Sequence, residues 1–212
     1  MSGRGLEPSR GAALLLTALF ALSAEAAAGP TQLGRVFERR HSAVVAVRVK
    51  ATWRAGFVIG GRGEVVLGGR SLPERFEVRT ADGALRWARR LAVHPRWPLT
   101  VARVEAWDPR PLDVGPAVRF RKEMWAMVMS VNASGQPEPF AGVFTENARR
   151  RKPTRLMSTA QLGSAILDLD GRLVGVAVTQ GGRETSVIGF STLKSFVIDA
   201  AATAPESPVG GD

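Results

Sequence analysis

The hydrophobic residues of this chain are grouped in short runs with turn-forming residues between them. Residues 45–50 alternate valine with other residue types, which is the period of a half-buried strand. Residues 60–63 are mostly glycine and residues 81–84 contain an Asp-Gly pair, and each segment separates two apolar runs as the turn of a β-hairpin does. The pattern predicts strands over residues 45–50, 56–59, 64–67, 76–80, 85–89, 99–105, 123–131, 142–145, 164–169, 173–179 and 186–190.

Helical periodicity is confined to the two ends of this strand-rich region. Segments 31–40 and 192–202 each place their apolar residues on one face, which predicts an N-terminal and a C-terminal helix. Many short strands with turns between them favour a barrel or a sandwich over an α/β fold, and they fall into two groups that meet near residues 107–111. We therefore predict an all-β fold of two six-stranded antiparallel barrels. The predicted domain spans residues 31–202, with one barrel over about 42–108 and the other over about 112–191.

The first residues of the chain have the pattern of a secretory signal peptide. Arg4 and Arg10 precede an apolar run over residues 11–23, and small residues suited to cleavage follow. We predict a signal peptide over residues 1–28, export to the periplasm or the medium, and no transmembrane segment after cleavage; an uncleaved anchor or a disordered tail is the alternative. The absence of cysteine is ordinary for a bacterial periplasmic protein. The Pro/Gly/Ser-rich tail, residues 203–212, is predicted to be disordered.

The net charge of +10 comes from 29 basic and 19 acidic residues, and arginine far outnumbers lysine. A GC-rich genome produces such a bias without selection for a ligand, so net charge alone identifies no partner. The densest basic cluster is a candidate site for an anionic polymer, a membrane surface or an acidic protein, and a solvated loop is the alternative. It lacks the interleaved aromatic residues that stack on nucleic-acid bases, so no nucleic-acid partner is expected. This cluster consists of Arg149, Arg150, Arg151, Lys152 and Arg155.

Residues 158–176 resemble the nucleophile segment of trypsin-like serine proteases of the HtrA/Deg type. In that family a Gly-Asn-Ser-Gly-Gly loop is followed by a strand, an Asp-Gly turn and a second strand. Here Leu162 occupies the position of the nucleophilic serine. The resemblance extends over residues 35–201 and implies a chymotrypsin-like pair of barrels, without the PDZ module that often follows.

Two further segments carry the same resemblance and show further substitutions. Residues 66–71 are similar to the family segment that supplies the catalytic histidine, and Arg70 stands at that position. Residues 94–104 are similar to the segment that supplies the catalytic aspartate, and Pro98 stands there. Arginine stays protonated and cannot act as a general base, proline has no carboxylate, and leucine has no nucleophile. The resemblance therefore implies a homologue without a catalytic triad.

An inactive homologue of this kind is expected to bind rather than to cleave. Residues 187–191 are similar to the family strand that lines the substrate pocket, and such an edge can receive an extended peptide or protein segment in the cell envelope by β-augmentation. Two histidines and no cysteine predict no metal site, and no motif predicts a cofactor. The candidate edge consists of Val187, Ile188, Gly189, Phe190 and Ser191.

Two other functions stay open at the level of sequence. A residual or unconventional serine endopeptidase could combine Ser164 or Ser158 with His94, although Ser164 also fits a strand entry and His94 a turn. A basic envelope-binding module would use the cluster at residues 149–152, with the fold as its carrier.

Overall fold

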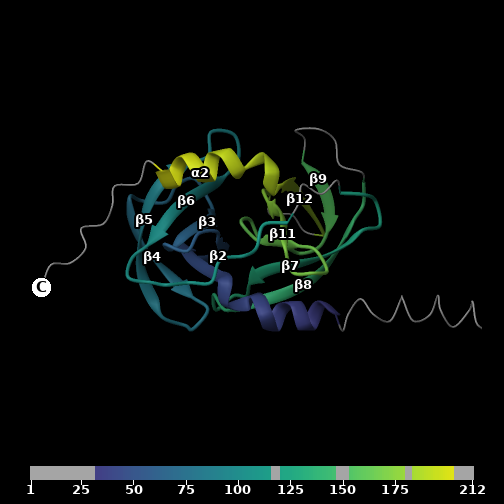
Figure 1. The fold of residues 1–212 in the computed structure, drawn as a ribbon, viewed down its shortest axis with the longest axis horizontal. Helices are drawn as coiled ribbons and strands as arrows, with labels where there is room; N and C mark the ends of the chain where they lie inside the picture. The colour runs from purple at the N-terminus through teal and green to yellow at the C-terminus, as the bar shows by residue number, and fades with distance from the viewer. Residues whose placement is uncertain (1–31, 116–119, 147–152, 180–182, 203–212) are drawn as a thin grey trace, which may run out of the picture.

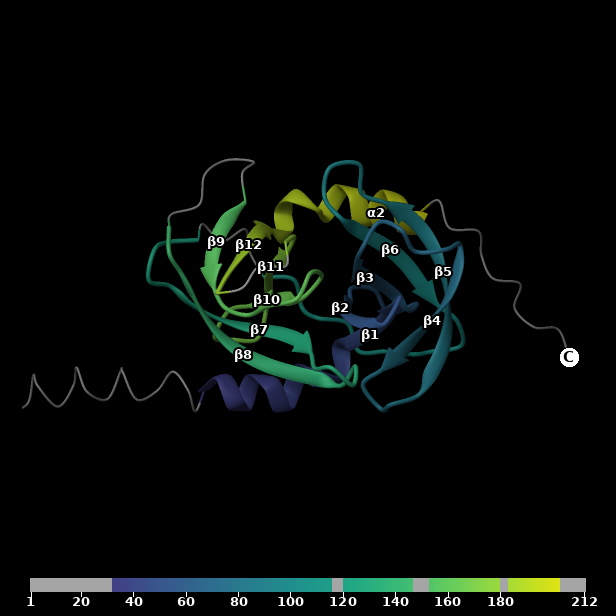
Figure 2. The same ribbon diagram turned by 180° about the vertical axis from the view of Figure 1, so that it is seen from behind.

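A computed structural model describes residues 32–115, 120–146, 153–179 and 183–202. Within these residues twelve strands form two closed antiparallel barrels, which confirms the predicted fold class (Figures 1 and 2). The predicted signal peptide, the predicted tail and the basic residues 149–152 lie outside the described residues.

The first barrel contains six strands in the order β1-β2-β3-β6-β5-β4. Hairpins join β1 to β2, β2 to β3 and β4 to β5, and β3 pairs with β6 to close the barrel. These strands are β1 (Val44–Val49), β2 (Thr52–Val58), β3 (Glu64–Gly68), β4 (Arg75–Thr80), β5 (Leu85–Val93) and β6 (Leu99–Val104).

The second barrel repeats this arrangement in the order β10-β11-β12-β9-β8-β7. A parallel bridge between Val114 and Leu173 fixes the connection between the barrels against β11. Its strands are β7 (Trp125–Val131), β8 (Pro137–Phe144), β9 (Thr154–Met157), β10 (Ala165–Leu167), β11 (Leu173–Ala177) and β12 (Glu184–Gly189).

The two barrels share one large hydrophobic core in addition to the smaller core inside the second barrel. On β7, Met127 and Met129 belong to the shared core, whereas Ala126 and Val128 face the interior of the second barrel. Because both faces of such a strand are covered, it is buried along nearly its whole length. On β1 the first four residues, including Ala46, are likewise buried, whereas Arg48 is exposed, so the predicted half-buried alternation holds only at the end of the strand.

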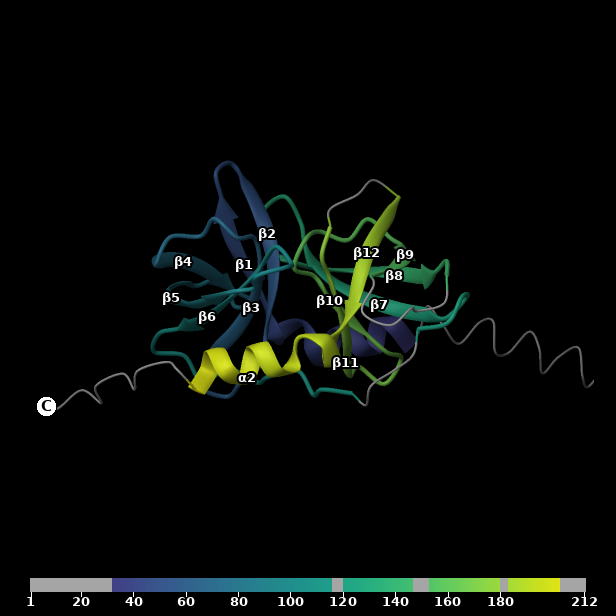
Figure 3. The ribbon, with the colours of Figure 1, turned by 90° about the horizontal axis from the view of Figure 1, so that it is seen from above.

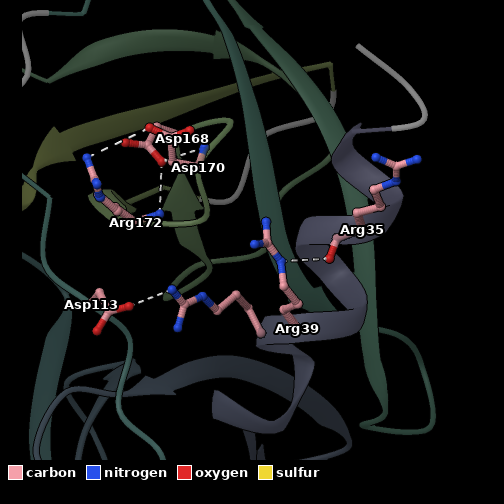
Figure 4. A network of polar contacts seen from close by, with 7 residues as sticks. Arg35, Arg39, Asp113, Asp168, Asp170 and Arg172 are labelled. Carbon is pink, nitrogen blue, oxygen red and sulfur yellow. Dashed lines mark hydrogen bonds and ion pairs between the residues drawn. The ribbon is translucent and has the colours of Figure 1, made fainter. Parts of the chain in front are cut away.

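Two helices attach the chain ends to the barrels. The helix over residues 32–40 lies beside the second barrel, where Gln32 donates from its Nε2 to the Leu169 carbonyl at 3.1 Å. Arg40 at its end forms an ion pair with Asp113 of the inter-barrel connection, beside the β10–β11 turn in which Asp168 accepts backbone N–H groups (Figure 4). Helix α2 (Lys194–Ala202) follows β12 but runs across to the first barrel (Figure 3).

Several segments differ from the sequence-based prediction; β2 starts four residues before its predicted start, and β5 ends four residues after its predicted end. Strand β9 was not predicted, because its four residues adjoin the basic cluster and alternate over only two periods. Strand β8 begins at Pro137, five residues before the predicted start, since its two prolines tolerate pairing at the start of the strand. Strand β12 ends at Gly189, and the 3-10 helix η2 (Phe190–Thr192) follows, so Phe190 does not belong to the strand.

Candidate functional site

Arg70 and Pro98, which the resemblance aligns with the histidine and aspartate of a catalytic triad, lie on adjacent segments of the first barrel. Arg70 follows β3 and Pro98 precedes β6, and these two strands pair with each other. The Gly69 N–H donates to the Pro98 carbonyl at 2.8 Å, and the Thr100 hydroxyl donates to the Gly69 carbonyl at 2.6 Å. Backbone pairing therefore fixes the distance between the two segments.

The third position, Leu162, approaches this pair from the second barrel. A Cβ atom on Gly68 would overlap the Leu162 carbonyl, and a Cβ atom on Gly163 would overlap the Gly68 N–H and the Ala55 carbonyl. Gly163 also has φ +88°, which favours glycine. Backbone contact at these two glycines brings all three triad-equivalent positions to the junction between the barrels.

Arg70 fastens the β5–β6 turn, residues 94–98. Its Nη2 donates to the Pro95 carbonyl at 2.9 Å and its Nε to the Trp97 carbonyl at 3.3 Å. A guanidinium has only donors and stays protonated, so it suits these two carbonyls and cannot accept a proton from a hydroxyl. The side chain at the histidine position thus holds a turn together.

His94 is largely buried within the same turn. Its Nδ1 accepts the N–H groups of Arg96 and Trp97 at 3.1 and 3.0 Å, and its ring meets the ring of Phe196 on α2 edge-on, with centroids 4.7 Å apart. Burial lowers the pKa of His94, and the cations Arg70 and Arg96 lower it further. Because the Nδ1 atom of His94 already accepts two backbone N–H groups, it cannot also accept the proton of a serine hydroxyl.

The loop around Leu162 is packed, and two of its backbone N–H groups have acceptors within the protein. Leu162 is only 6% exposed. The Gly163 N–H donates to the Ala177 carbonyl at 2.9 Å, and the Ser164 N–H donates to the Gln161 carbonyl at 3.1 Å. An oxyanion hole needs N–H groups that point at free space beside the nucleophile, and these two do not provide it.

The two serines considered as alternative nucleophiles are both buried. The Ser164 hydroxyl donates to the Ser130 hydroxyl at 2.9 Å, and neither residue is exposed. The Ser158 hydroxyl is buried with no hydrogen-bond partner among the described residues. His94 contacts the first barrel's turn and α2, and the structure records no contact between it and either serine.

Three polar residues that the sequence did not single out hold this loop in place. The Thr185 hydroxyl on β12 lies 3.0 Å from the Ser158 carbonyl and 3.3 Å from the Ala160 carbonyl. Gln161 donates from its Nε2 to the Val131 carbonyl at 2.8 Å, and Ser130 pairs with Ser164. Isolated Ser, Thr and Gln residues carry no sequence signal for such contacts, because their partners lie far away along the chain.

The candidate peptide-binding edge is divided between a strand and a turn. On one side of β12, Val187, Ile188 and Gly189 pair with β11. On the other side β9 pairs only with Glu184–Val187, so Ile188 and Gly189 extend past β9 among the described residues. The last two members, Phe190 and Ser191, lie in η2. Val187, Ile188 and Gly189 have the extended backbone that strand addition requires, and of these only Ile188 and Gly189 lack a β9 partner among the described residues.

The candidate anion-binding cluster is described only at Arg155. This residue lies on β9 and forms an ion pair with Glu184 on β12 at 2.8 Å. Hydrogen bonding to Glu184 raises the pKa of Arg155, which therefore stays cationic. Arg149, Arg150, Arg151 and Lys152 fall outside the described residues.

No group of three potential metal ligands gathers in the part of the chain that the structure describes. A pocket of about 370 Å³ opens in the first barrel beside the β4–β5 turn, where Asp82 and Trp107 are among its lining residues. A hydrogen bond from the Thr80 hydroxyl, with one from the Ala84 N–H, lowers the pKa of Asp82, so this carboxylate serves the hairpin. None of the triad-equivalent positions lines this pocket.

No helix among the described residues is both long and apolar enough to cross a membrane. No protein-family model matches the chain, and no curated protein is similar to it at a significant level.

Proposed function

We propose that this protein is a catalytically inactive homologue of trypsin-like serine proteases, of the HtrA/Deg type, which binds an extended protein or peptide segment in the cell envelope after export. The observation that supports the proposal is that backbone contacts at Gly68 and Gly69 bring the segments containing Arg70, Pro98 and Leu162 together at the junction of two six-stranded barrels. Three separate segments thus reach the place where a triad would be assembled, and none of them supplies a base, a carboxylate or a nucleophile.

The surroundings of these residues also support a binding role over a hydrolytic one. At this site Arg70 binds the carbonyls of a turn, Leu162 is buried, and the Ser164 hydroxyl is hydrogen-bonded to Ser130. Each of these side chains therefore has a structural role. Packing of this loop stabilises the junction between the two barrels.

The proposed binding edge is the end of β12. Ile188 and Gly189 extend past β9, so one side of their backbone is available to an added strand. Main-chain hydrogen bonds would then supply affinity that depends little on the ligand's sequence.

Loss of hydrolysis is tested with a fluorophosphonate probe, which labels activated serines, and with casein turnover. We expect neither labelling nor turnover, with active trypsin as the positive control. Labelling that disappears in the Ser164→Ala variant would overturn the proposal, since it would identify a working nucleophile.

Peptide binding is tested by selection from a displayed peptide library, followed by hydrogen exchange on the complex with a selected peptide. We expect protection of the backbone N–H groups at residues 188–189 when the peptide is present. Failure to select any peptide would contradict binding, and protection confined to the first barrel would contradict the β12 edge.

A further inference from the structure

The positive charge of the described chain is concentrated in the first barrel. Residues 41–111, which include all six strands of that barrel, contain thirteen Lys and Arg residues and six Asp and Glu residues. The described residues from 112 to 202 contain six Lys and Arg residues and eight Asp and Glu residues. An anionic group is therefore attracted to the first barrel more than to the second.

Two of these cations flank the β5–β6 turn, residues 94–98. Arg96 lies within the turn, and Arg70 reaches it from the segment after β3 and donates to two of its carbonyls. Both arginines are exposed. Neither forms an ion pair with an acidic residue in the part of the chain that the structure describes.

The electrostatic surroundings of His94, inside the same turn, also lack a carboxylate. Burial lowers the pKa of His94 most, the charges of Arg70 and Arg96 lower it further, and no acidic residue is among the causes. Helix α2 packs against this histidine, and its two charged residues, Lys194 and Asp199, have opposite signs. The turn therefore presents two guanidinium groups whose charge no neighbouring carboxylate offsets.

The turn also holds these guanidinium groups in place. His94 accepts the N–H groups of Arg96 and Trp97, which fixes the backbone that carries Arg96. The Cζ atom of Arg96 lies 4.7 Å from the centroid of the Trp97 ring, in a cation–π contact. Arg70 uses its Nε and Nη2 atoms for the turn, and no described residue accepts from its Nη1. Groups that are positioned in advance lose less conformational entropy when a ligand binds.

The turn lies next to the elements that the proposed function uses. Pro98 at its end accepts the Gly69 N–H, and the neighbouring Gly68 contacts the Leu162 loop of the second barrel. Helix α2, which contacts the turn through Phe196, follows β12 in the chain, and β12 carries the proposed binding edge. The two arginines therefore belong to the junction between the barrels.

We propose that Arg70 and Arg96 form an anion-binding pair that receives the carboxylate of an Asp or Glu residue in the segment bound by this protein. The proposal rests on the peptide-binding function proposed above and adds that the ligand is acidic. A guanidinium stays charged and presents parallel N–H groups that match a carboxylate. Two cations beside one turn suit a single acidic side chain, whereas an anionic membrane surface is recognised by clusters of roughly four to eight basic residues.

The selection from a displayed peptide library also tests the charge of the ligand. We expect the selected peptides to share an Asp or Glu at one fixed position. The Arg96→Glu variant should lose this preference, because the introduced carboxylate cancels the charge of Arg70. Arg110→Glu is the matched control, since Arg110 is exposed in the connection after β6 and should leave the preference unchanged.

Fluorescence anisotropy with one selected acidic peptide measures the contribution of the pair to affinity. We expect Arg96→Gln to weaken binding about tenfold, as the loss of a charge-assisted hydrogen bond does, and Arg110→Gln to change it less than about twofold. Arg96 suits this test because the described contact of its side chain is the Trp97 ring, whereas Arg70 supports the turn. Thermal unfolding confirms that both variants are folded.

A second measurement does not depend on a selected peptide. Nuclear magnetic resonance follows the His94 ring while soluble poly-L-glutamate is added, with the resonances of His41 in η1 as the internal control. Carboxylates bound at Arg70 and Arg96 offset the two cations that lower the pKa of His94, so this pKa should rise. The rise should be smaller in the Arg96→Gln variant.

The outcomes separate this inference from the proposed function. Selected peptides without an acidic preference, or equal affinities of Arg96→Gln and Arg110→Gln, would overturn the arginine pair and leave the β12 edge standing. Failure to select any peptide would contradict the proposed function, and a His94 pKa that stays unchanged with poly-L-glutamate would overturn the arginine pair by itself. A response of His94 to alginate in preference to poly-L-glutamate would identify an anionic polysaccharide as the ligand and overturn the peptide assignment.

Discussion

The carbonyl oxygen of Leu162 occupies the space that a Cβ atom on Gly68 would need. Gly68 ends β3 in the first barrel and Leu162 lies in the loop before β10 in the second, so this contact joins two segments that are distant in the sequence. It also explains how the loop equivalent to a nucleophile loop reaches Arg70, which follows Gly68 by two residues. The contact requires a glycine because backbone meets backbone, and neither side can rotate away.

The Gly68→Ala variant should therefore be clearly destabilised. We expect a loss of about 1–3 kcal/mol in the free energy of unfolding, the usual cost of forcing extra volume into a packed site. Gly61→Ala is the matched control, because a Cβ atom there meets nothing within 4 Å and the residue is exposed. Urea denaturation measures both, and equal stabilities of the two variants would show that the barrels do not approach as closely as described.

The stability of the protein should decrease when the pH falls below the ordinary histidine pKa of 6.5. Burial and the cations Arg70 and Arg96 lower the pKa of His94 in the folded state, so the unfolded state takes up a proton first. Between the two pKa values the unfolded state binds more protons, and the free energy of unfolding falls as the pH falls. Above the unfolded pKa, His94 is neutral in both states and contributes no pH dependence.

Urea denaturation at a series of values from about pH 8 to about pH 5 measures this slope. His94→Asn is the informative variant, because an asparagine side chain can accept turn N–H groups, as Asn132 does from Ser134 and Gln136. The variant should lose the part of the slope that His94 contributes. An unchanged slope would show that His94 is not held neutral by this turn.

A buried ion pair links two neighbouring strands of the first barrel. Glu64 on β3 lies directly opposite Arg103 on β6, and their side chains pair at 3.0 Å with little exposure of either. Removing Glu64 alone leaves an uncompensated buried cation, so Glu64→Leu should lose about 3–5 kcal/mol of stability.

The double variant Glu64→Leu/Arg103→Met should recover most of this loss, because an apolar pair of similar size has no charge to desolvate. The exposed pair Arg75–Glu105, at 2.9 Å, provides the comparison. Glu105→Leu should change stability by less than about 1 kcal/mol. Denaturation of the unchanged protein, the single variants Glu64→Leu and Arg103→Met, and the double variant gives the coupling energy, and a coupling near zero would contradict a buried pair.

The effects of replacing Ser130 and Ser164 on the free energy of unfolding should not be additive, because their hydroxyls are hydrogen-bonded to each other. Ser164→Ala leaves the buried Ser130 hydroxyl without its partner, and we expect a loss of about 1–3 kcal/mol in the free energy of unfolding. Replacing both serines by alanine should cost less than the sum of the two single changes, since no unsatisfied hydroxyl is left. Additive losses in thermal or urea unfolding would show that the two hydroxyls do not interact.

Much of the fold could be predicted because its strands carry local signals. The hairpin glycines at residues 60–63 and the Asp-Gly turn at residues 82–83 lie between apolar runs, and strands flank both turns as expected. Strand β9 had no such signal, since four residues next to a basic cluster show too little alternation. The boundary between β12 and η2 was also missed, because nothing in Gly189-Phe190 distinguishes a strand residue from a turn residue.

The candidate site could be predicted only in part. The resemblance identified Arg70, Pro98 and Leu162 and what they lack. It did not reveal that Arg70 clamps the β5–β6 turn, or that His94 accepts two N–H groups there, because both depend on which carbonyls and amides a turn presents. Ser130 and Thr185 went unnoticed for the same reason.

By itself the sequence determined the alternation of strands and turns, the absence of cysteine and the residue types at three positions, because these properties are local or compositional. The tertiary structure decided which of those residues meet. The approach of Gly68 to Leu162 and the placement of Arg70 against the turn at residues 94–98 both follow from how two closed barrels set strand register and backbone contact. Register and closure arise from pairing between distant segments, and no short stretch of the chain contains that information.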